Sequence, residues 1–566
     1  MTVSKLARFL GVALSLAIVL TLAVGATYAQ DEAKVLHTAI GQVAGDLNTI
    51  DPAVSEVASE HQITTLLWPG LTVQDEVTAE VVPGIASGWD ISEDGATYTY
   101  HIRPDISWVR YNAESGAVEQ VLDEDGNPRI VTAHDIVYGW QRTLAPETAS
   151  PYAYVLQVVV VNGAEVTAGE ATPEELGIVA VDDFTVEITM PEALAYAPGI
   201  HGLWMATAQP AWAIDEGGDL WTEPEYIATY GAFALKEWAH DESITLIKNP
   251  FWVATETIEQ PILDEVVFHF LDPQAAFAEF EAGTLDASDV PLEELERVKA
   301  DPELSAMYSN GARMCTYYLG FDNTEAPMDN ANLRRALSYA IDRVSLVENV
   351  TRGGQIPAQW FSRPGLGAAP TPEEYPDLGI SYDPAAAQES LAAALSDLGL
   401  ASVEELPPLS LAYGDGAGHA AIVQAIQQMW TDTLGITVQL TAMDPTTYFA
   451  TVSEDAPIIY RSGWCQDYPD ANNFLYDVLY SQSSQNDPGY NNPEFDALLE
   501  QARVSTDQEE RLELYAQAEE ILVVQDAGVA PIYWYTTNQV TRPYVERTYS
   551  IVGDEAYEVW DINRGE

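Results

Sequence analysis

Positively charged side chains are scarce in this chain. Its 566 residues include 23 Lys and Arg against 88 Asp and Glu, which gives a formal net charge of −65. Nucleic acids and anionic membranes are bound through clustered Lys and Arg, so this balance makes both poor partners. A cationic or zwitterionic solute is compatible with it. The acidic residues are spread over the whole chain, however, and a general solubility adaptation accounts for them as well.

Sequence motifs of catalytic and metal sites are absent. The chain has no His-Glu-x-x-His, no Cys-x-x-Cys and no Gly-x-Ser-x-Gly, and its 8 His residues are scattered without metal-ligand spacing. We therefore expect no metal, no cofactor and no catalytic residues. Glycosidase chemistry needs only two carboxylates, so a secreted hydrolase stays open as an alternative from another functional class.

Long apolar runs are limited to the N-terminus. Lys5 and Arg8 precede an apolar run from Phe9 to Val24, and Thr27-Tyr28-Ala29 supplies small residues for cleavage. This pattern predicts a signal peptide over residues 1–29, cleaved near Ala29. An uncleaved anchor is the alternative, because the run approaches membrane-spanning length. No Cys lies near the site, which excludes lipid attachment there, and we expect a periplasmic or cell-surface protein.

Cysteine is almost absent, with Cys315 and Cys465 as the only pair. An exported protein with one pair of cysteines favours a disulfide, and two buried free thiols are the alternative. A bridge would close a loop of 150 residues. Chain-entropy treatments value such a loop at roughly 5 kcal/mol, as an upper figure.

The composition is that of a folded protein with more than one domain. A chain of 566 residues with 47% hydrophobic and 10% aromatic residues is too long for one core, so two or three domains are expected. Residues 409–413 and 436–440 show strand patterns, and the apolar side chains of residues 420–434 have helical spacing. This strand–helix–strand order indicates an α/β protein with partly parallel sheets.

One late segment, residues 461–470, carries the functional signal. Pro457-Ile458-Ile459-Tyr460 predicts the apolar end of a buried strand. Pro469 prevents a strand or a helix from continuing through this position. We therefore expect a loop that presents Trp464, Cys465 and Asp467. Ligand-binding groups are often found where rigid strands pass into loops.

This segment resembles the Gly-Trp-Cys-x-Asp-Tyr motif of the periplasmic oligopeptide-binding proteins, which are solute-binding proteins of family 5 and the substrate-binding subunits of peptide ABC importers. Other parts of the chain resemble the family in the same order, from about residue 34 to the C-terminus. They are the Trp, Asp-Gly and Tyr-Thr-Tyr-x-Ile-Arg run of residues 89–103, the helix of residues 132–142, the Gly-x-Phe-x-Leu-x-x-Trp strand of residues 231–238 and the Arg-x-Ala-Leu helix of residues 334–343.

The resemblance implies an α/β, two-lobed periplasmic-binding-protein (Venus flytrap) fold of the large three-domain type, with mixed sheets and helices. Residues 30–68, 212–314 and 536–566 would form domain I of the first lobe. Residues 69–211 would form an inserted domain II, and residues 315–535 a domain III that makes the second lobe. An insertion of about twenty residues after Trp108 is expected to form a solvated hairpin.

The resemblance also implies the site for the peptide's N-terminus. Asp467 would pair with the free ammonium, and Glu56 stands at a second acidic position that faces it. Tyr152 and Trp464 would supply apolar walls. The backbone near Gly463 to Cys465 would hydrogen-bond an extended peptide added as a strand.

The resemblance implies roles for further residues, in less detail. Arg461 would support Asp467 or line a side-chain pocket, and His419 would face the far end of the peptide. The relatives have a disulfide at the positions of Cys315 and Cys465. Basic residues that hold the peptide carboxylate in some relatives are replaced here by Val452, Gly320 and Thr351, so the resemblance does not define peptide length.

The function implied is that of an extracytoplasmic solute-binding protein of an ABC importer, not an enzyme. It would bind oligopeptides and deliver them, as a monomer, to membrane permease and ATPase subunits. Because other members of the wider family bind oligosaccharides, nickel complexes or opines, such solutes are the alternatives within the same fold.

Overall fold

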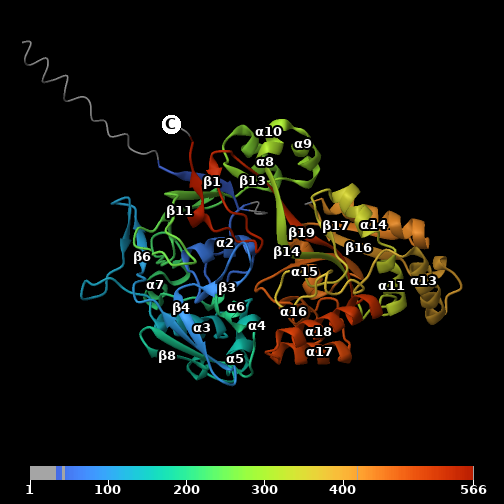
Figure 1. Cartoon of the computed structure of the whole chain (residues 1–566), viewed down its shortest axis with the longest axis horizontal. Helices are drawn as coiled ribbons and strands as arrows, with labels where there is room; N and C mark the ends of the chain where they lie inside the picture. Colours follow the sequence, from blue (N-terminus) through green and yellow to red (C-terminus); the bar gives the residue numbers. More distant parts are fainter. Residues whose placement is uncertain (1–32, 41–44, 417, 565–566) are drawn as a thin grey trace, which may run out of the picture.

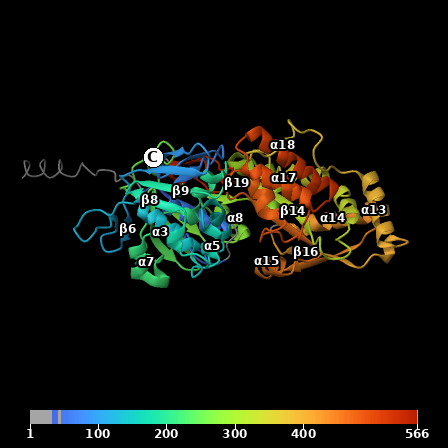
Figure 2. The same cartoon turned by 90° about the horizontal axis from the view of Figure 1, so that it is seen from below.

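A computed structural model describes residues 33–40, 45–416 and 418–564 of the chain (Figure 1). The predicted signal peptide lies outside these residues. Elements from the first half of the chain gather in one lobe, and most elements after residue 310 gather in a second lobe beside it (Figure 2). None of the helices among the described residues is both long and apolar enough to span a membrane.

The first lobe contains a four-stranded sheet made from distant parts of the chain. Its order is β1-β12-β11-β10, with β1 parallel to β12 and the other neighbours antiparallel. Burial alternates along β1 (Val35–Ala39) and β12 (Glu265–His269), whereas β10 (Phe233–Ala239) and β11 (Ser243–Lys248) each contain three consecutive buried residues. The C-terminal hairpin, β20 (Val545–Glu546) with β21 (Asp561–Ile562), and helix α2 (Ala58–Leu67) belong to the same lobe.

A second sheet in this lobe has the order β4-β5-β9-β8. Its strands are β4 (Ala86–Ile91), β5 (Thr97–Ile102), β8 (Ile178–Asp182) and β9 (Thr185–Thr189). A turn at Asp94-Gly95 joins β4 to β5, with Gly95 at φ +74°, a conformation that glycine adopts readily. Helix α3 (Ala133–Leu144) packs on this sheet and buries Ile136 and Trp140.

The insertion after Trp108 forms the expected hairpin. Strands β6 (Val109–Asn112) and β7 (Ala117–Gln120) pair antiparallel, and most side chains at its tip are exposed. Smaller elements complete the lobe: β2 (Thr72–Gln74), β3 (Val81–Pro83), α4 (Ala153–Leu156), α5 (Gly163–Thr167), α6 (Ala197–His201) and α7 (Ala211–Gly217).

The second lobe is built on a mixed sheet of seven described strands. The main path is β13-β19-β14-β18-β16-β17, and β15 pairs with β19. Strand β16 runs parallel to β17 and β18, whereas β14 is antiparallel to β18 and β19. The strands are β13 (Ala287–Asp289), β14 (Tyr308–Phe321), β15 (Ile356–Pro357), β16 (Leu409–Gly414), β17 (Val438–Met443), β18 (Ile459–Cys465) and β19 (Val529–Thr541).

Two long strands connect the lobes. The start of β14 pairs with the end of β19 next to β13, and the rest of both strands lies in the sheet of the second lobe. Helices α8 (Pro273–Ala282), α9 (Leu295–Ala300) and α10 (Pro302–Met307) lie at one end of this pair (Figure 1). The sheet is covered by α11 (Ala331–Tyr339), α12 (Arg343–Leu346), α13 (Pro384–Leu398), α14 (His419–Leu434), α15 (Pro445–Glu454), α16 (Asn472–Leu479), α17 (Pro493–Val504) and α18 (Gln508–Glu519).

Two helical regions of the second lobe are interrupted. The stretch up to Val344 divides into α11 and α12, and the Val344 side chain is 53% exposed. The stretch after residue 495 divides into α17 and α18. Asp342 and Asp507 each accept backbone N–H groups at the start of the next helix, so these side chains act as N-caps and restart the helix.

Candidate functional site

Strand β18 runs further than the sequence predicts. It begins at Ile459 and continues through Cys465, so Trp464 and Cys465 belong to the strand, and the expectation of a loop from residue 461 was wrong. The reason is long-range pairing: β14 offers an uninterrupted antiparallel partner along the whole of β18. Only Asp467 lies beyond the strand, two residues after its end.

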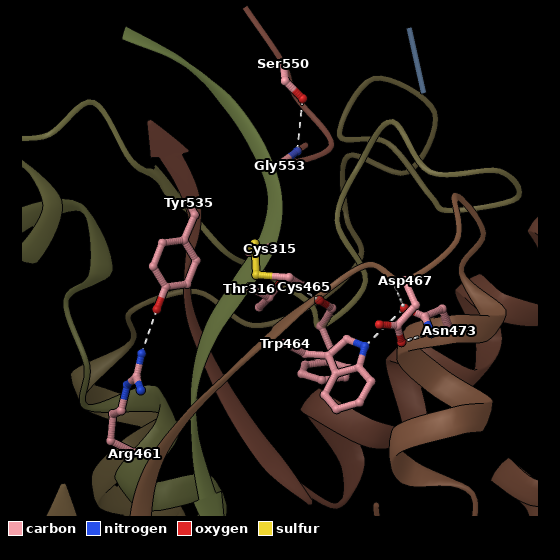
Figure 3. The surroundings of a disulfide bond; sticks show 11 residues. Cys315, Thr316, Arg461, Trp464, Cys465, Asp467, Asn473, Tyr535, Ser550 and Gly553 are labelled. Atoms are coloured by element: carbon pink, nitrogen blue, oxygen red, sulfur yellow. Dashed lines mark hydrogen bonds between the residues drawn. A yellow bond between two sulfur atoms is a disulfide. The ribbon is translucent and has the colours of Figure 1, made fainter. Parts of the chain in front are cut away.

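The predicted disulfide is confirmed. Cys315 on β14 lies directly opposite Cys465 on β18, with the Cα atoms 4.0 Å apart and the sulfur atoms bonded (Figure 3). The bridge joins the last residue of β18 to a strand that is buried in the sheet. It therefore fixes the point from which the chain enters the Asp467 loop.

Asp467 is held in place mainly by one amide side chain. Asn473, in the first turn of α16, donates from Nδ2 to Asp467 Oδ2 at 3.0 Å. Its Oδ1 accepts from the Asp467 backbone N–H at 2.9 Å and from Trp464 Nε1 at 3.1 Å (Figure 3). Tyr152 of the first lobe donates its hydroxyl to Asp467 Oδ1 at 3.4 Å. The orientation of Asp467 thus depends on both lobes.

Every side chain that hydrogen-bonds the Asp467 carboxylate is neutral. Burial raises the pKa of Asp467 to about 6, and the hydrogen bonds from Asn473 and Tyr152 lower it only in part. Among the residues that the structure describes, no Lys or Arg forms an ion pair with Asp467. A partly buried carboxylate of this kind is the electrostatic complement of a cation.

A cavity of about 660 Å³ lies beside Asp467. Its wall combines residues of the second lobe with residues of α2, of the β2–β3 region and of the C-terminal segment 548–559. A volume of this size suits a small ligand enclosed between two lobes. Of the predicted site residues, the wall contains Glu56, Tyr152, Trp464, Cys465 and Asp467.

The part of the wall nearest Tyr152 is aromatic. Trp204 stacks on His61 with ring centroids 3.4 Å apart, and Tyr152 meets Trp204 edge-on at 4.8 Å. Burial lowers the pKa of His61 to about 3, so this ring is neutral at physiological pH. The aromatic wall is therefore uncharged, and the acidic groups next to it are Asp467 and Glu56.

The Asp467 loop also contacts the first lobe through glutamine side chains. Gln74 donates from Nε2 to the Asp467 carbonyl at 2.9 Å, and Gln466 donates from Nε2 to Gln74 Oε1 at 2.7 Å. These bonds cross from one lobe to the other. The relative position of the lobes and the position of Asp467 are consequently linked.

Three predicted site residues are not part of the cavity wall as described: Gly463, Arg461 and His419. The Arg461 guanidinium donates to the Tyr535 hydroxyl at 2.8 Å and lies over the Tyr317 ring at 4.8 Å. It does not support Asp467, because it lies on the other side of the disulfide (Figure 3). His419, at the start of α14, lies 5.7 Å from the Tyr317 ring, and burial lowers its pKa to about 3.

Several site residues escaped the sequence analysis. Asn473, Gln74, Gln466 and Trp204 each contact Asp467, its loop or the aromatic wall, and the acidic segment 548–559 lines the cavity. Gln466 directly precedes Asp467 and Asn473 lies six residues after it, so proximity in the sequence was the available signal for these two. The other contacts join residues that are far apart in the sequence.

Two lobes that enclose a cavity, joined by long crossing strands, are the architecture of extracytoplasmic solute-binding proteins. The chain belongs to the bacterial extracellular solute-binding proteins, family 5, whose middle-region profile matches residues 80–486. The family resemblance and the two-lobed α/β fold expected from the sequence are thereby confirmed. The family is defined by solute binding, not by catalysis.

Several similar proteins are named as periplasmic peptide-binding proteins. The chain is 30% identical to the periplasmic oligopeptide-binding protein OppA of Salmonella typhimurium, over 90% of this chain and 89% of that protein. It is 31% identical to the periplasmic murein peptide-binding protein MppA of Escherichia coli, over 88% of each chain. The structure of Haemophilus influenzae OppA in complex with the peptide RPPGFSPFR matches with a TM-score of 0.77 and 27% identity, over 94% of this chain and 99% of that chain.

Proposed function

We propose that this protein binds oligopeptides between its lobes, by their free N-terminus and their backbone, and delivers them to an ABC importer. The names of its relatives support a peptide ligand. The observation that carries the proposal is the Asp467 carboxylate, which faces a cavity and has only neutral hydrogen-bond partners. A peptide ammonium supplies the missing positive charge.

The free edge of β18 supports recognition of the peptide backbone. On one side β18 pairs with β14 along its whole length, whereas β16 reaches only Ile459 and Tyr460 on the other side. Among the described strands, none pairs with this second edge from Arg461 to Cys465. An extended peptide that adds here as a strand would be read through its backbone, so its side chains would be only loosely specified.

The proposed domain organisation follows the predicted boundaries. Domain I comprises residues 30–68, 212–314 and 536–566, domain II comprises residues 69–211, and domain III comprises residues 315–535. The sheet β4-β5-β9-β8 falls within domain II, and the sheet β1-β12-β11-β10 falls within domain I, which is consistent with this division. The ligand would favour the closed arrangement by contacting both lobes at once.

We also propose that the protein is exported and acts outside the cytoplasm. Residues 1–29 would direct export and be removed near Ala29, and the mature protein would act as a monomer. It would pass its ligand to permease and ATPase subunits in the membrane without changing it chemically, so we assign no catalytic residues.

A thermal-shift screen of the mature protein tests the proposal. Tri- to pentapeptides with a free N-terminus should raise the melting temperature, and their N-acetylated forms should not, because acetylation removes the positive charge. A ligand at 100 times its Kd adds about 2.7 kcal/mol of stability. Stabilisation by oligosaccharides, nickel complexes or opines in place of peptides would overturn the assigned ligand while leaving the fold unaffected.

A further inference from the structure

A second part of the cavity wall is acidic. Three glutamates contribute to it from separate elements: Glu76 follows β2, Glu259 precedes β12, and Glu558 lies in a short 3₁₀ helix before β21. Backbone contacts hold these segments together. The Ala556 N–H donates to Glu76 Oε2 at 2.9 Å, and the Ile262 N–H donates to the Glu558 carbonyl at 3.2 Å. We refer to Glu76, Glu259 and Glu558 as the glutamate cluster.

Glu558 is the unusual member, because its carboxylate is buried without a partner. The residue is only 7% exposed, and the one group that hydrogen-bonds its carboxylate is its own backbone N–H. Burial, together with the negative charges of Glu76 and Glu259, raises the pKa of Glu558 to about 7. Buried charges in folded proteins normally have partners, and no basic side chain of the described residues supplies one to this carboxylate.

Nearby basic side chains are already engaged by other acids. Arg547 forms an ion pair with Glu555 at 2.6 Å. Arg313, the arginine in the described cavity wall, acts on Asp554 and lowers its pKa against the effect of burial. Among the described residues, neither arginine forms an ion pair with the glutamate cluster. This distinguishes the cluster from buried acids such as Asp470, which has the guanidinium of Arg511 at 2.6 Å.

An organic cation fits the glutamate cluster better than a metal ion. Within the described part of the chain, no group of three or more His, Cys, Asp or Glu side chains is placed to hold a metal. An ammonium or a guanidinium at the end of a flexible side chain carries several N–H donors and can reach carboxylates that are too widely spaced for one metal ion. A lysine or arginine side chain has this chemistry.

We propose that the glutamate cluster is a subsite for a Lys or Arg side chain of the bound peptide, separate from the ammonium site at Asp467. This inference rests on the proposed function and narrows it to peptides that carry a second positive charge. Hydrogen bonds to charged groups are the strongest that a side-chain subsite offers. The broad backbone recognition at β18 would then be combined with selection for basic peptides.

The test compares peptides that differ by one charge. Calorimetric Kd values are measured for tri-alanine and for tripeptides with Lys, or its uncharged analogue norleucine, at each position in turn. The proteins are the mature wild type, Glu558→Gln, and Glu546→Gln as a control. Glu546 lies in the same C-terminal segment but is exposed and does not line the cavity, so this control makes the same charge change outside the cluster.

At one position, Lys should bind about tenfold or more tightly than norleucine to the wild type and to Glu546→Gln. Glu558→Gln should lose most of this preference. The wild-type preference should also grow between pH 6 and pH 8, as Glu558 loses its proton beside Glu76 and Glu259, and Glu558→Gln should remove this growth. The preference is the ratio of the Kd values for the norleucine and the Lys peptide. Effects of pH on the peptide N-terminus and on Asp467 are the same for both peptides and cancel in this ratio.

Two results would overturn the inference. If tri-alanine binds and Lys gives no advantage at any position, or if Glu558→Gln keeps the full advantage, the glutamate cluster is not a subsite, although the proposed function survives. If none of the peptides binds, the proposed function fails and the subsite fails with it. Melting temperatures of the three proteins without ligand would show that each variant is folded.

Discussion

Asp467, the proposed partner of the peptide ammonium, is held in place by neutral neighbours. Asn473 fixes the Asp467 backbone and side chain together, and Tyr152 adds a hydroxyl from the other lobe. None of these groups cancels its charge. Under the proposed function, the cost of burying the carboxylate is offset when a cation binds, so the site would select ligands with a positive group.

We expect Asp467→Asn to weaken binding of free tri-alanine by about 2 kcal/mol, or roughly 30-fold, because the ammonium loses its charged partner. Binding of N-acetyl-tri-alanine should change little. Calorimetric titration of both peptides measures the effect, with the exposed Asp455→Asn on the same lobe as a control. Equal losses for the free and the acetylated peptide would contradict the ammonium model.

Another buried carboxylate, Glu519, predicts a pH-dependent stability. Glu519 is 0% exposed and accepts the backbone N–H groups of Phe361 at 2.9 Å and Ser362 at 2.6 Å. Burial raises its pKa from 4.5 to about 7. The folded state thus binds this proton more tightly than the unfolded state. Stability from Glu519 is fully present below pH 4.5 and is lost as the pH rises through about 7.

Glu519→Gln should remove this loss. Between pH 4.5 and pH 8.5, the stability of the variant relative to the wild type should rise by up to about 3 kcal/mol. The melting temperatures of both proteins across this range give the result, and Glu513→Gln, an exposed change on the same helix, should show no such trend. A difference between Glu519→Gln and the wild type that does not vary with pH would count against the prediction.

At the scale of elements, the pairing of β14 with β18 positions the site. The disulfide at the end of this pair closes 150 residues of chain. Because it joins opposite residues of neighbouring strands, it restrains the strand end that leads into the Asp467 loop. The bridge thus lowers the conformational entropy of the unfolded chain, and in the folded chain it restrains the position of the site.

Replacing both cysteines, as Cys315→Ala with Cys465→Ala, should lower the stability by up to about 5 kcal/mol. The melting temperature measures this loss, and a reducing agent should lower the melting temperature of the wild type while leaving that of the double variant unchanged. If the reduced wild type and the double variant both melt at the temperature of the oxidised protein, the bridge does not stabilise the fold.

At the scale of the whole molecule, the two lobes meet through polar contacts around the cavity, through the stacked rings of Tyr196 and Tyr468 and through the Arg503–Glu192 ion pair. Gln74 contacts both Gln466 and the Asp467 carbonyl, so it joins the β2–β3 region of the first lobe to the binding loop of the second. The strands β14 and β19 are the long continuous elements that connect the lobes. Closure of the lobes and ligand binding therefore share these contacts.

Gln74→Ala should weaken peptide binding roughly 3- to 30-fold, because two interlobe hydrogen bonds of about 1 kcal/mol each are lost. The ratio of free to acetylated peptide affinity should stay the same, since Asp467 keeps its side-chain partners. Small-angle scattering at a fixed peptide concentration should show a larger radius of gyration for Gln74→Ala than for Gln388→Ala, a change at an exposed position of the second lobe. An unchanged affinity would show that these contacts do not take part in closure.

The sequence by itself determined the family, the fold class, the cysteine pair and the candidate ammonium partner. These features depend on short motifs in a fixed order, such as the segment from Gly463 to Tyr468, and on local patterns of apolar and turn residues. The turn at Gly95 and the helix from Ala133 follow from such local rules, and both are present in the structure. Apolar spacing was less informative about where helices begin. The side chains of Asp342 and Asp507 cap new helices at these points, and apolar spacing does not register such caps.

Only the tertiary structure decided which side chains surround the ligand cavity. Tyr152 and Asp467 are 315 positions apart, and Gln74 and Gln466 are 392 positions apart, so no local pattern joins them. Pairing with β14 placed Trp464 on a strand, and the packing of the second lobe directed Arg461 to Tyr535, away from Asp467. The same reason applies to Glu558: in a chain with 88 acidic residues, burial beside Glu76 and Glu259 distinguishes it, and burial is a property of the folded chain.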